Sequence, residues 1–219
     1  MNATQVLKRT IDIFAASSLL IILSPLLVFI AIAIWVREGR PIFYISKRYI
    51  GVNREESIVK FRTMVLDAKS PKYNLAARFM KDGYLDIPVN CEVYTGTGRL
   101  LEKSQLVEAL QLLNVLFHGL SIIGNRPLPK ENIMHLQQFE GWEMRFASPA
   151  GMTGISQVIG KFNLKPKERL EIEKLYSRVY QEGNVLKCDF EIIFFTIRLI
   201  VTGKTISVEY ARKLLESCL

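Results

Sequence analysis

Hydrophobic residues fill positions 13–36 without a single charged side chain, and this is the longest apolar stretch of the chain. About 20 apolar residues in a helix are enough to cross the hydrocarbon core of a bilayer. A secretory signal peptide would have a shorter apolar core, of about 7–15 residues, followed by a small-residue cleavage site. This stretch ends instead in Trp35 and Val36, which is typical of an anchor. We therefore predict a membrane-embedded helical segment.

Ser24 and Pro25 lie in the middle of the apolar stretch and leave two topologies open. Proline lacks the backbone N–H and clashes with the carbonyl four residues before it, so it kinks or breaks a helix. Cationic flanks favour the cytoplasmic side, but both flanks are basic here, so charge assigns no orientation. The segment is either a kinked single span or a hairpin that turns at Ser24 and Pro25. The basic pair Lys8 and Arg9 is expected at the lipid surface in both cases.

The remaining chain shows the shorter periodicities of a folded domain. Apolar runs and alternation predict short strands at residues 42–45, 57–64 and 155–159. A polar, weakly periodic segment, residues 67–88, indicates helical fragments and loop, and the glycine-rich residues 95–99 indicate a turn. The predicted strand at 57–64 places Lys60 and Arg62 on one face. Such a charged face is either solvated or a phosphate contact.

Helical periodicity predicts helices at residues 104–117, 130–145, 165–180 and 189–201. Ser104 is the expected N-cap of the first of them, and Glu108 is then a lone carboxylate in its first turn, where the helix dipole favours negative charge. The last helix is too short and too charged to span a membrane, so it packs on the core or lies in the interface.

These elements give a mainly helical α/β fold class with short strands and amphipathic interfacial helices. Residues 1–40 form the basic lead-in and the membrane segment, and residues 41–219 form a cytosolic domain. The cysteines, Cys91, Cys188 and Cys218, are scattered and match neither a disulfide framework nor a zinc site, which indicates reduced cytosolic thiols.

The net charge of +8 suits anionic lipid head groups or a phosphorylated substrate. Nucleic-acid binding fits less well, because the charges are dispersed and no recognisable module is present. Arg126 stands between Asn125 and Pro127, where proline stiffens the backbone. The planar fork of arginine suits phosphate.

The order of these features resembles the bacterial sugar transferases, also called monotopic phosphoglycosyl transferases. The resemblance covers essentially the whole chain and is carried by Lys8-Arg9-x-x-Asp12, Ser24-Pro25, Gly39-Arg40-Pro41-Ile42-Phe43, Arg48, Gly51, Lys60-Phe61-Arg62-Thr63-Met64, Asp67-Ala68, Gly98-Arg99-Leu100-Leu101, Gln111-Leu112-Leu113-Asn114-Val115-Leu116, Gly124-x-Arg126-Pro127, Gly151-Met152-Thr153-Gly154, Gln157-Val158, Gly160, Tyr176 and Asp189.

The resemblance implies a re-entrant membrane helix broken at Ser24 and Pro25, with both termini in the cytoplasm of a bacterium and the domain at the inner membrane. It implies transfer of a sugar 1-phosphate from a nucleotide diphosphate sugar to polyprenyl phosphate, usually with magnesium. This reaction initiates exopolysaccharide, O-antigen or glycoconjugate synthesis. By the same resemblance, the substrate-binding residues are Lys60, Arg62, Asn125, Arg126, Pro127 and Gln157.

The family uses an adjacent Asp-Glu dyad, in which Asp attacks the phosphoryl group and Glu lies beside it near the metal. Here the dyad falls on Val107 and Glu108, so the nucleophile is replaced by an apolar side chain and Glu108 alone remains for catalysis and metal binding. Further departures from the family pattern are Glu102 in place of arginine and Leu110, Asn125 and Ala150 in place of prolines.

Two hypotheses follow from this departure. The first is a working transferase with impaired or altered catalysis, in which Glu108 attacks or assists direct transfer. The second is a catalytically silent, membrane-bound homologue that binds substrate or serves as a scaffold. Its expected partners are membrane lipids and either a second copy of the chain or other enzymes of the pathway.

Overall fold

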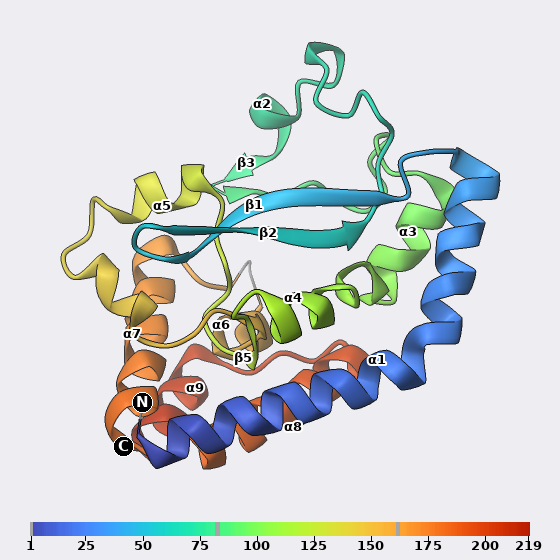
Figure 1. Cartoon of the computed structure of the whole chain (residues 1–219). Coiled ribbons are helices and arrows are strands. Elements are labelled where there is room, and N and C mark those ends of the chain that lie inside the picture. Colours follow the sequence, from blue (N-terminus) through green and yellow to red (C-terminus); the bar gives the residue numbers. More distant parts are fainter. Residues whose placement is uncertain (1, 82–83, 161–162) are drawn as a thin grey trace.

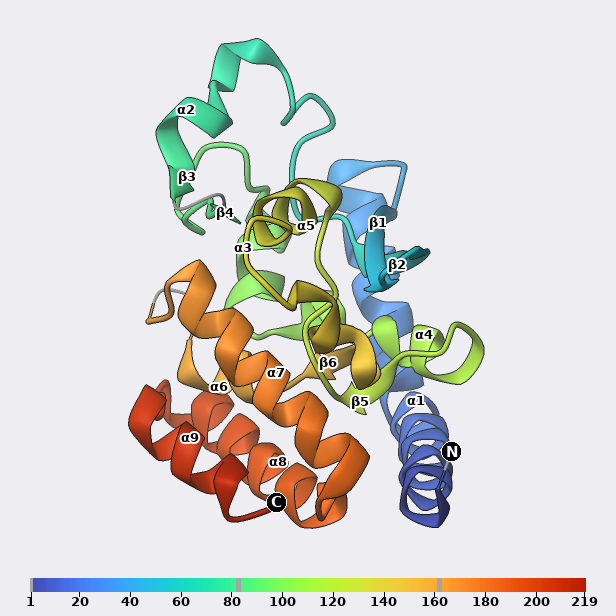
Figure 2. The same cartoon turned by 90° about the vertical axis from the view of Figure 1, so that its left-hand side faces the viewer.

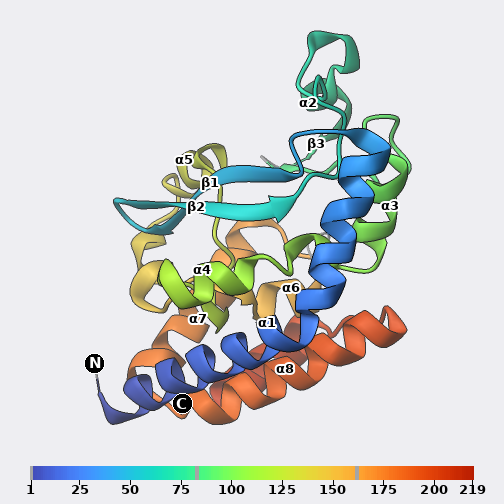
Figure 3. The same cartoon turned by 45° about the vertical axis from the view of Figure 1, so that its right-hand side comes forward.

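The computed structural model describes residues 2–81, 84–160 and 163–219 of the chain. Its first helix, α1 (Ala3–Glu38), begins at a capping box formed by Asn2 and Gln5 and ends at Gly39, whose φ of 71° suits glycine. Figures 1 and 3 show α1 turning sharply in its middle, the part that contains Pro25. The predicted break is therefore a bend within one continuous helix. Among the described residues, α1 is the helix long and apolar enough to cross a membrane.

The N-terminal end of α1 is fixed to the domain by buried polar contacts. Lys8 is 3% exposed, and its Nζ lies 2.6 Å from Asp189 Oδ2 and donates to the Ile123 carbonyl at 3.0 Å. Asp12 accepts from Ser121 Oγ at 2.6 Å. The guanidinium of Arg9 donates to backbone carbonyls beyond α1. The expectation that Lys8 and Arg9 lie at the lipid surface is wrong, because the domain supplies acceptors for both cations.

The C-terminal end of α1 is fixed to the same domain. Arg62 Nη2 donates to the carbonyls of Glu38 and Gly39, at 2.9 Å each. Glu38 Oε1 accepts from the backbone N–H of Thr97 at 3.2 Å. The last carbonyls of a helix have no partner within the helix, and a cation beside them satisfies two of these here. Both ends of α1 therefore contact one domain.

Strands β1 (Phe43–Gly51) and β2 (Arg54–Phe61) form an antiparallel ribbon. Both predicted strands exist, but β1 is longer than predicted, and β2 begins and ends three residues earlier than the predicted range 57–64. Between the ribbon and the next helices, the chain makes an excursion with its own small core around Val93. This excursion contains 3₁₀ helix η1 (Pro71–Tyr73), α2 (Leu75–Phe79), β3 (Met80–Lys81) and β4 (Tyr84–Leu85). Figure 1 shows it above the ribbon, as predicted for a segment of helical fragments and loop.

Residues 96–117 differ from the predicted turn and single helix. The structure has α3 (Gly96–Lys103), η2 (Leu106–Glu108) and α4 (Gln111–Phe117). Thr95 is the N-cap of α3, and Ser104 is its C-cap rather than the start of a helix. Gln105, with a φ of 59°, separates α3 from η2. Gly98 allows α3 to lie against the chain, because a Cβ there would stand 2.0 Å from the Thr63 carbonyl oxygen.

The C-terminal half is helical apart from the parallel pair β5 (Ser121–Ile123) and β6 (Gly151–Thr153). Its helices are α5 (Lys130–Leu136), η3 (Trp142–Ala147), α6 (Ile155–Ile159), α7 (Pro166–Glu182), α8 (Val185–Thr202) and α9 (Val208–Glu216). Figure 2 shows α7, α8 and α9 packed together, with α1 beside them. The predicted helices at 165–180 and 189–201 are confirmed, whereas that at 130–145 divides into α5 and η3.

The prediction of a strand at 155–159 is wrong, since this segment is α6. Its apolar residues Ile155, Val158 and Ile159 are spaced i, i+3, i+4 and are all buried in the core between α6, α7, α8 and α9. That spacing is helical, because a strand would bury residues at i, i+2 and i+4. The fold class, mainly helical with short strands, is confirmed.

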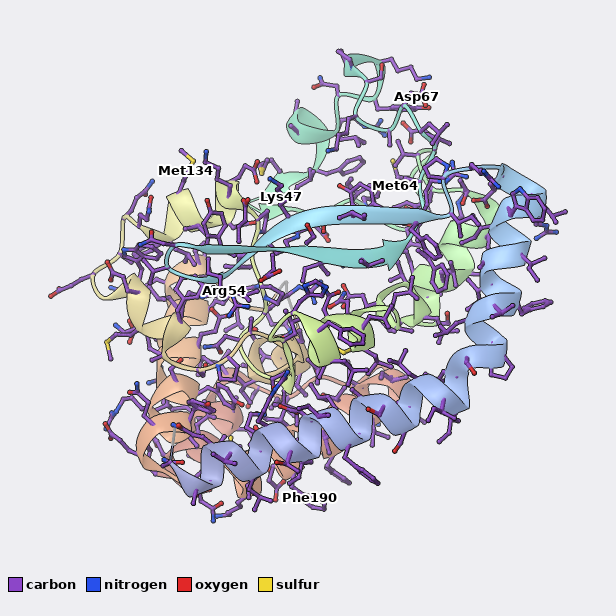
Figure 4. The ribbon with its side chains drawn as sticks, in the orientation of Figure 1. Lys47, Arg54, Met64, Asp67, Met134 and Phe190 are labelled. Atoms are coloured by element: carbon purple, nitrogen blue, oxygen red, sulfur yellow. The ribbon has the colours of Figure 1, made fainter. Side chains whose placement is uncertain are left out.

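Helix α8 has two different faces. Cys188 and Ile192 are buried in the core, whereas Phe190, Phe194, Ile197 and Val201 are more than half exposed. Figure 4 shows Phe190 pointing away from the domain on the side where α1 and α8 run together. Packing on the core is therefore confirmed for one face of α8, and the exposed apolar face leaves the interfacial position a prediction. The cysteines Cys91, Cys188 and Cys218 are free and buried.

Candidate active site

A small cavity of about 30 Å³ lies between the β-ribbon, η2 and the loop after β5. Such a volume holds about one or two water molecules. The described residues that line it are Arg48, Ile58, Lys60, Glu108, Gln111, Arg126 and Pro127. Cations from three places in the chain thus surround a single carboxylate.

The ribbon presents Arg48 and Lys60 on the same face. Tyr44 lies directly opposite Lys60, so these two side chains share a face of the ribbon. Arg48 is four residues after Tyr44 on the same strand, and side chains an even number of residues apart point to the same face, so Arg48 and Lys60 share it too. Asn114 holds α4 against this ribbon, because its side-chain amide donates to the Ser57 carbonyl at 2.7 Å and accepts from Val59 N–H at 3.2 Å. The ribbon face and η2 are thereby brought together.

Arg126 enters from the loop after β5 and is fixed through its backbone. Arg145 Nη2 donates to the Arg126 carbonyl at 2.8 Å, and Arg145 Nε donates to Glu173 Oε2 at 2.8 Å. Arg145 is 1% exposed and Glu173 is fully buried. Pro127 further limits the backbone after Arg126. The backbone of Arg126 is therefore held by a buried ion pair, while its guanidinium is left to contact Glu108.

Glu108 is the centre of the charge cluster. Its Oε1 lies 2.5 Å from Lys60 Nζ and 2.9 Å from Arg126 Nη2, and Oε2 lies 3.5 Å from Arg126 Nη1. Burial alone would raise the pKa of this carboxyl. The charges and hydrogen bonds of Arg126 and Lys60 outweigh burial and hold that pKa well below its usual range. Glu108 is therefore an ionised acceptor and not a proton donor at neutral pH.

The basic side chains influence each other as well. Burial lowers the pKa of Lys60, with Arg126 acting in the same direction and Glu108 against it. Burial, together with Arg126, also lowers the pKa of Arg48. Glu108 raises the pKa of Arg126. Crowded cations that oppose one another in this way favour the binding of a further anion.

The structure brings together Lys60, Glu108, Arg126 and Pro127 from the residues expected at the site. Arg62 follows the end of β2 and turns to the C-terminus of α1. Asn125, Gln157 and Ser24 do not line the cavity. Asn125 is buried and donates to the Glu173 carbonyl, and Gln157 on α6 contacts Ser156 and Met152. Ser24 Oγ donates to the Ile21 carbonyl, beside Pro25.

Arg48 and Gln111 line the cavity but were not expected at the site. Both belong to motifs that carry the family resemblance, so their presence in the chain was visible in the sequence. What was missing was the register of the ribbon, which places Arg48 on the same face as Lys60.

Val107 does not face the charge cluster. It is 6% exposed and packs among Ile30 and Ile34 of α1 and Phe61 of β2. Glu102, expected in place of a phosphate-facing arginine, accepts from Thr63 Oγ1 at 3.1 Å. The two positions that depart in chemistry from the resemblance therefore serve packing and a local hydrogen bond.

Glu108 is the carboxylate that the described lining of the cavity offers to a magnesium ion. In the part of the chain that the structure describes, no group of three or more His, Cys, Asp or Glu side chains could hold a metal. Mg²⁺ favours carboxylate and phosphate oxygens in octahedral geometry. The carboxylate present, Glu108, already faces two cations.

Comparison with known proteins places this site in a family. The sequence model of the bacterial sugar transferases matches residues 3–203. The chain belongs to the bacterial sugar transferase family. The match includes α1, the ribbon and the cavity residues.

Curated relatives agree with that assignment. The chain is 30% identical over 197 residues to a UDP-glucose:undecaprenyl-phosphate glucose-1-phosphate transferase of Klebsiella pneumoniae, covering 88% of the chain and 39% of the relative. It is 28% identical to an undecaprenyl-phosphate galactose phosphotransferase of Salmonella typhimurium, covering 91% and 41%. The chain thus spans about two fifths of the length of these relatives. It spans 94% of the exopolysaccharide production protein PSS of Rhizobium leguminosarum, at 27% identity over 88% of the chain.

Proposed function

We propose that this chain acts in the membrane step that initiates exopolysaccharide, O-antigen or glycoconjugate synthesis. It binds a nucleotide diphosphate sugar and polyprenyl phosphate and moves a sugar 1-phosphate between them, with altered or impaired catalysis. The observation that supports this is the cluster of Arg48, Lys60 and Arg126 around Glu108. Arginine and lysine at close range offset the charge of phosphates during phosphoryl transfer.

The residues of the cavity limit the chemistry. Glu108 is the one carboxylate among the described residues that line it. A carboxylate that attacks phosphorus splits the transfer into two steps, and one that accepts a proton or orients the acceptor assists direct transfer. Val107 has no lone pair and does neither. Any turnover by this chain therefore passes through Glu108.

A second candidate function is a silent homologue that binds substrate without transfer. Two observations favour it: Val107 is packed in an apolar cluster, and Glu108 is held by two cations. In this role the chain presents a bound nucleotide sugar, or a docking surface, to another copy or to other enzymes of the pathway.

A transfer assay with membranes, polyprenyl phosphate and a panel of labelled nucleotide sugars separates the two functions. The variants are wild type, Glu108→Gln and Val107→Asp. Turnover in wild type that Glu108→Gln abolishes establishes the altered transferase. An inactive wild type whose Val107→Asp variant is active establishes a silenced fold. Labelled lipid formed equally well by wild type and Glu108→Gln would exclude the Glu108 mechanism.

The membrane arrangement follows from the attachment of α1. Its N-terminal end contacts Asp189 and its C-terminal end contacts Arg62 and Thr97, all within residues 41–219. A single span would carry these two ends to opposite sides of the bilayer. We therefore favour a re-entrant hairpin in the bacterial inner membrane, with lipid against the exposed faces of α1 and α8 and the domain in the cytoplasm.

Accessibility of single cysteines tests this topology. After Cys91, Cys188 and Cys218 are replaced by serine or alanine, a cysteine at Asn2 and one at Arg40 should react with a membrane-impermeant maleimide from the same side only. In intact cells, both should remain unlabelled until the inner membrane is permeabilised. Labelling of Arg40→Cys but not Asn2→Cys in intact cells would establish a span instead.

A further inference from the structure

The charge cluster around Glu108 differs from a magnesium-dependent phosphate site. Mg²⁺ sites in phosphoryl-transfer enzymes combine one or two carboxylates with substrate phosphates and water. Here one carboxylate oxygen, Oε1, already receives both Lys60 Nζ and Arg126 Nη2, and Oε2 faces Arg126 Nη1 at 3.5 Å. A divalent cation at Glu108 would have to displace the two donors at Oε1 or bind Oε2 beside the charged guanidinium of Arg126.

The net charge of the cavity lining also favours a ligand without a divalent cation. Three cations, Arg48, Lys60 and Arg126, oppose one carboxylate, so the lining has two net positive charges. The diphosphate of a nucleotide sugar carries about two negative charges at neutral pH, because its phosphate pKa values lie well below 7. A metal-free diphosphate therefore complements the cavity, whereas a magnesium diphosphate would bring a neutral ligand to a cationic site.

Glu108 also occupies the place that suits an incoming anion. Its carboxylate accepts from the same two side chains that would donate to a phosphate. Arginine and lysine bind carboxylate and phosphate oxygens with the same donors. An entering phosphate and Glu108 thus compete for Lys60 and Arg126, while Arg48 adds a third positive charge from the neighbouring strand.

We propose that Arg48, Lys60 and Arg126 bind the diphosphate of the ligand without a divalent cation, and that Glu108 is a competing internal anion that must move aside, because the cavity as it stands has room for only about one or two water molecules. This inference rests on the proposed function, because it concerns the same substrate at the same site. It makes Glu108 an opponent of diphosphate binding, whereas a metal ligand would support it. Glu108→Gln should therefore strengthen diphosphate binding if Glu108 is a competitor, and weaken it if Glu108 is a metal ligand.

The test is equilibrium binding of inorganic pyrophosphate and of UDP to the full chain in lipid nanodiscs, with either EDTA or MgCl₂. Wild type should bind in EDTA at least as tightly as in MgCl₂, because the protein supplies the positive charge and magnesium neutralises the ligand. Glu108→Gln should bind at least ~tenfold more tightly in EDTA, the order expected when a charged competitor for two donors is removed. Arg48→Ala should bind at least ~tenfold more weakly.

Lys47→Ala is the matched control for Arg48→Ala. Lys47 precedes Arg48 on β1, its side chain is 75% exposed, and its ion-pair partner is Glu55. Figure 4 labels it on the ribbon. This variant should bind like wild type, since the two neighbouring side chains lie on opposite faces of the strand.

The outcomes separate this inference from the proposed function. Binding that requires MgCl₂, and that Glu108→Gln weakens, overturns the metal-free site and leaves the transferase function standing. Binding of neither probe under either condition overturns both. If Glu108→Gln fails to fold, two measurements still distinguish a metal-free site from a magnesium-dependent one. These are the affinity of wild type in EDTA and in MgCl₂, and the affinity of Arg48→Ala.

Discussion

Lys8→Met should lower the free energy of unfolding by about 3–5 kcal/mol, the cost of leaving a buried charge without its partner. Lys8 Nζ lies 2.6 Å from Asp189 Oδ2 and 3.6 Å from Asp12 Oδ2, and both aspartates are buried. Methionine keeps the length of the side chain and removes its charge. Two carboxylates would then share an enclosed space at the junction of α1 and α8, and α1 would lose its N-terminal attachment.

The loss should depend on pH. Burial raises the pKa of Asp189, and the positive charge of Lys8 opposes this rise. Without Lys8 the carboxyl binds a proton more readily in the folded state than in the unfolded state. The loss is therefore smallest in acid, and it grows as pH rises from the ordinary carboxyl value of about 4 through the raised folded-state pKa.

Chemical denaturation in detergent, followed by the fluorescence of Trp35 and Trp142, measures the Lys8→Met effect. Lys187→Met on α8 is the control, because Lys187 is exposed and donates to the Ser217 carbonyl. It should change stability by less than about 0.5 kcal/mol. Equal losses in the two variants, or a loss independent of pH, would contradict the buried ion pair.

Arg145→Met should also cost about 3–5 kcal/mol, since it leaves the fully buried Glu173 without its cation. It removes the donor to the Arg126 carbonyl as well. Without this contact, the Arg126 backbone should be less rigidly held, and its guanidinium less precisely positioned beside Glu108. Diphosphate binding is expected to weaken even at temperatures where the variant remains folded.

The double variant Arg145→Met/Glu173→Met separates these two effects. Replacing both members of a buried ion pair by apolar residues of similar size is often close to neutral, so stability should recover in large part. Diphosphate affinity should not recover, because the contact to the Arg126 carbonyl is still missing. Thermal unfolding and pyrophosphate titration on the same samples measure the two quantities. Full recovery of affinity would exclude a positioning role for Arg145.

The sequence predicted the elements that have a strong local signal. The apolar run with Pro25, the alternation around Lys60 and the long periodic helices α7 and α8 were all visible in the pattern. The wrong predictions concern short segments whose state is decided by tertiary contacts. Residues 155–159 carry β-branched side chains, which are typical of strands, but their apolar positions are spaced as in a helix and pack among α7, α8 and α9.

The sequence predicted which residue types form the site, but it did not predict the direction in which each side chain points. Lys60, Glu108 and Arg126 converge, as the resemblance implied. Arg62 alternates with Lys60 in the sequence, yet β2 ends at Phe61 and the free carbonyls of α1 take the guanidinium. Lys8 and Arg9 were assigned to the lipid surface because the sequence does not show that Asp189 and backbone carbonyls lie beside them.

The most direct test of the account is whether the cluster around Glu108 binds the nucleotide sugar. It compares the binding of a panel of UDP-, GDP- and dTDP-sugars to wild type, Arg126→Ala and Lys47→Ala. The expected result is saturable binding of at least one nucleotide sugar by wild type and Lys47→Ala, with affinity at least ~tenfold lower in Arg126→Ala because a bidentate phosphate contact is lost. Equal affinity in wild type and Arg126→Ala would contradict this location of the donor site.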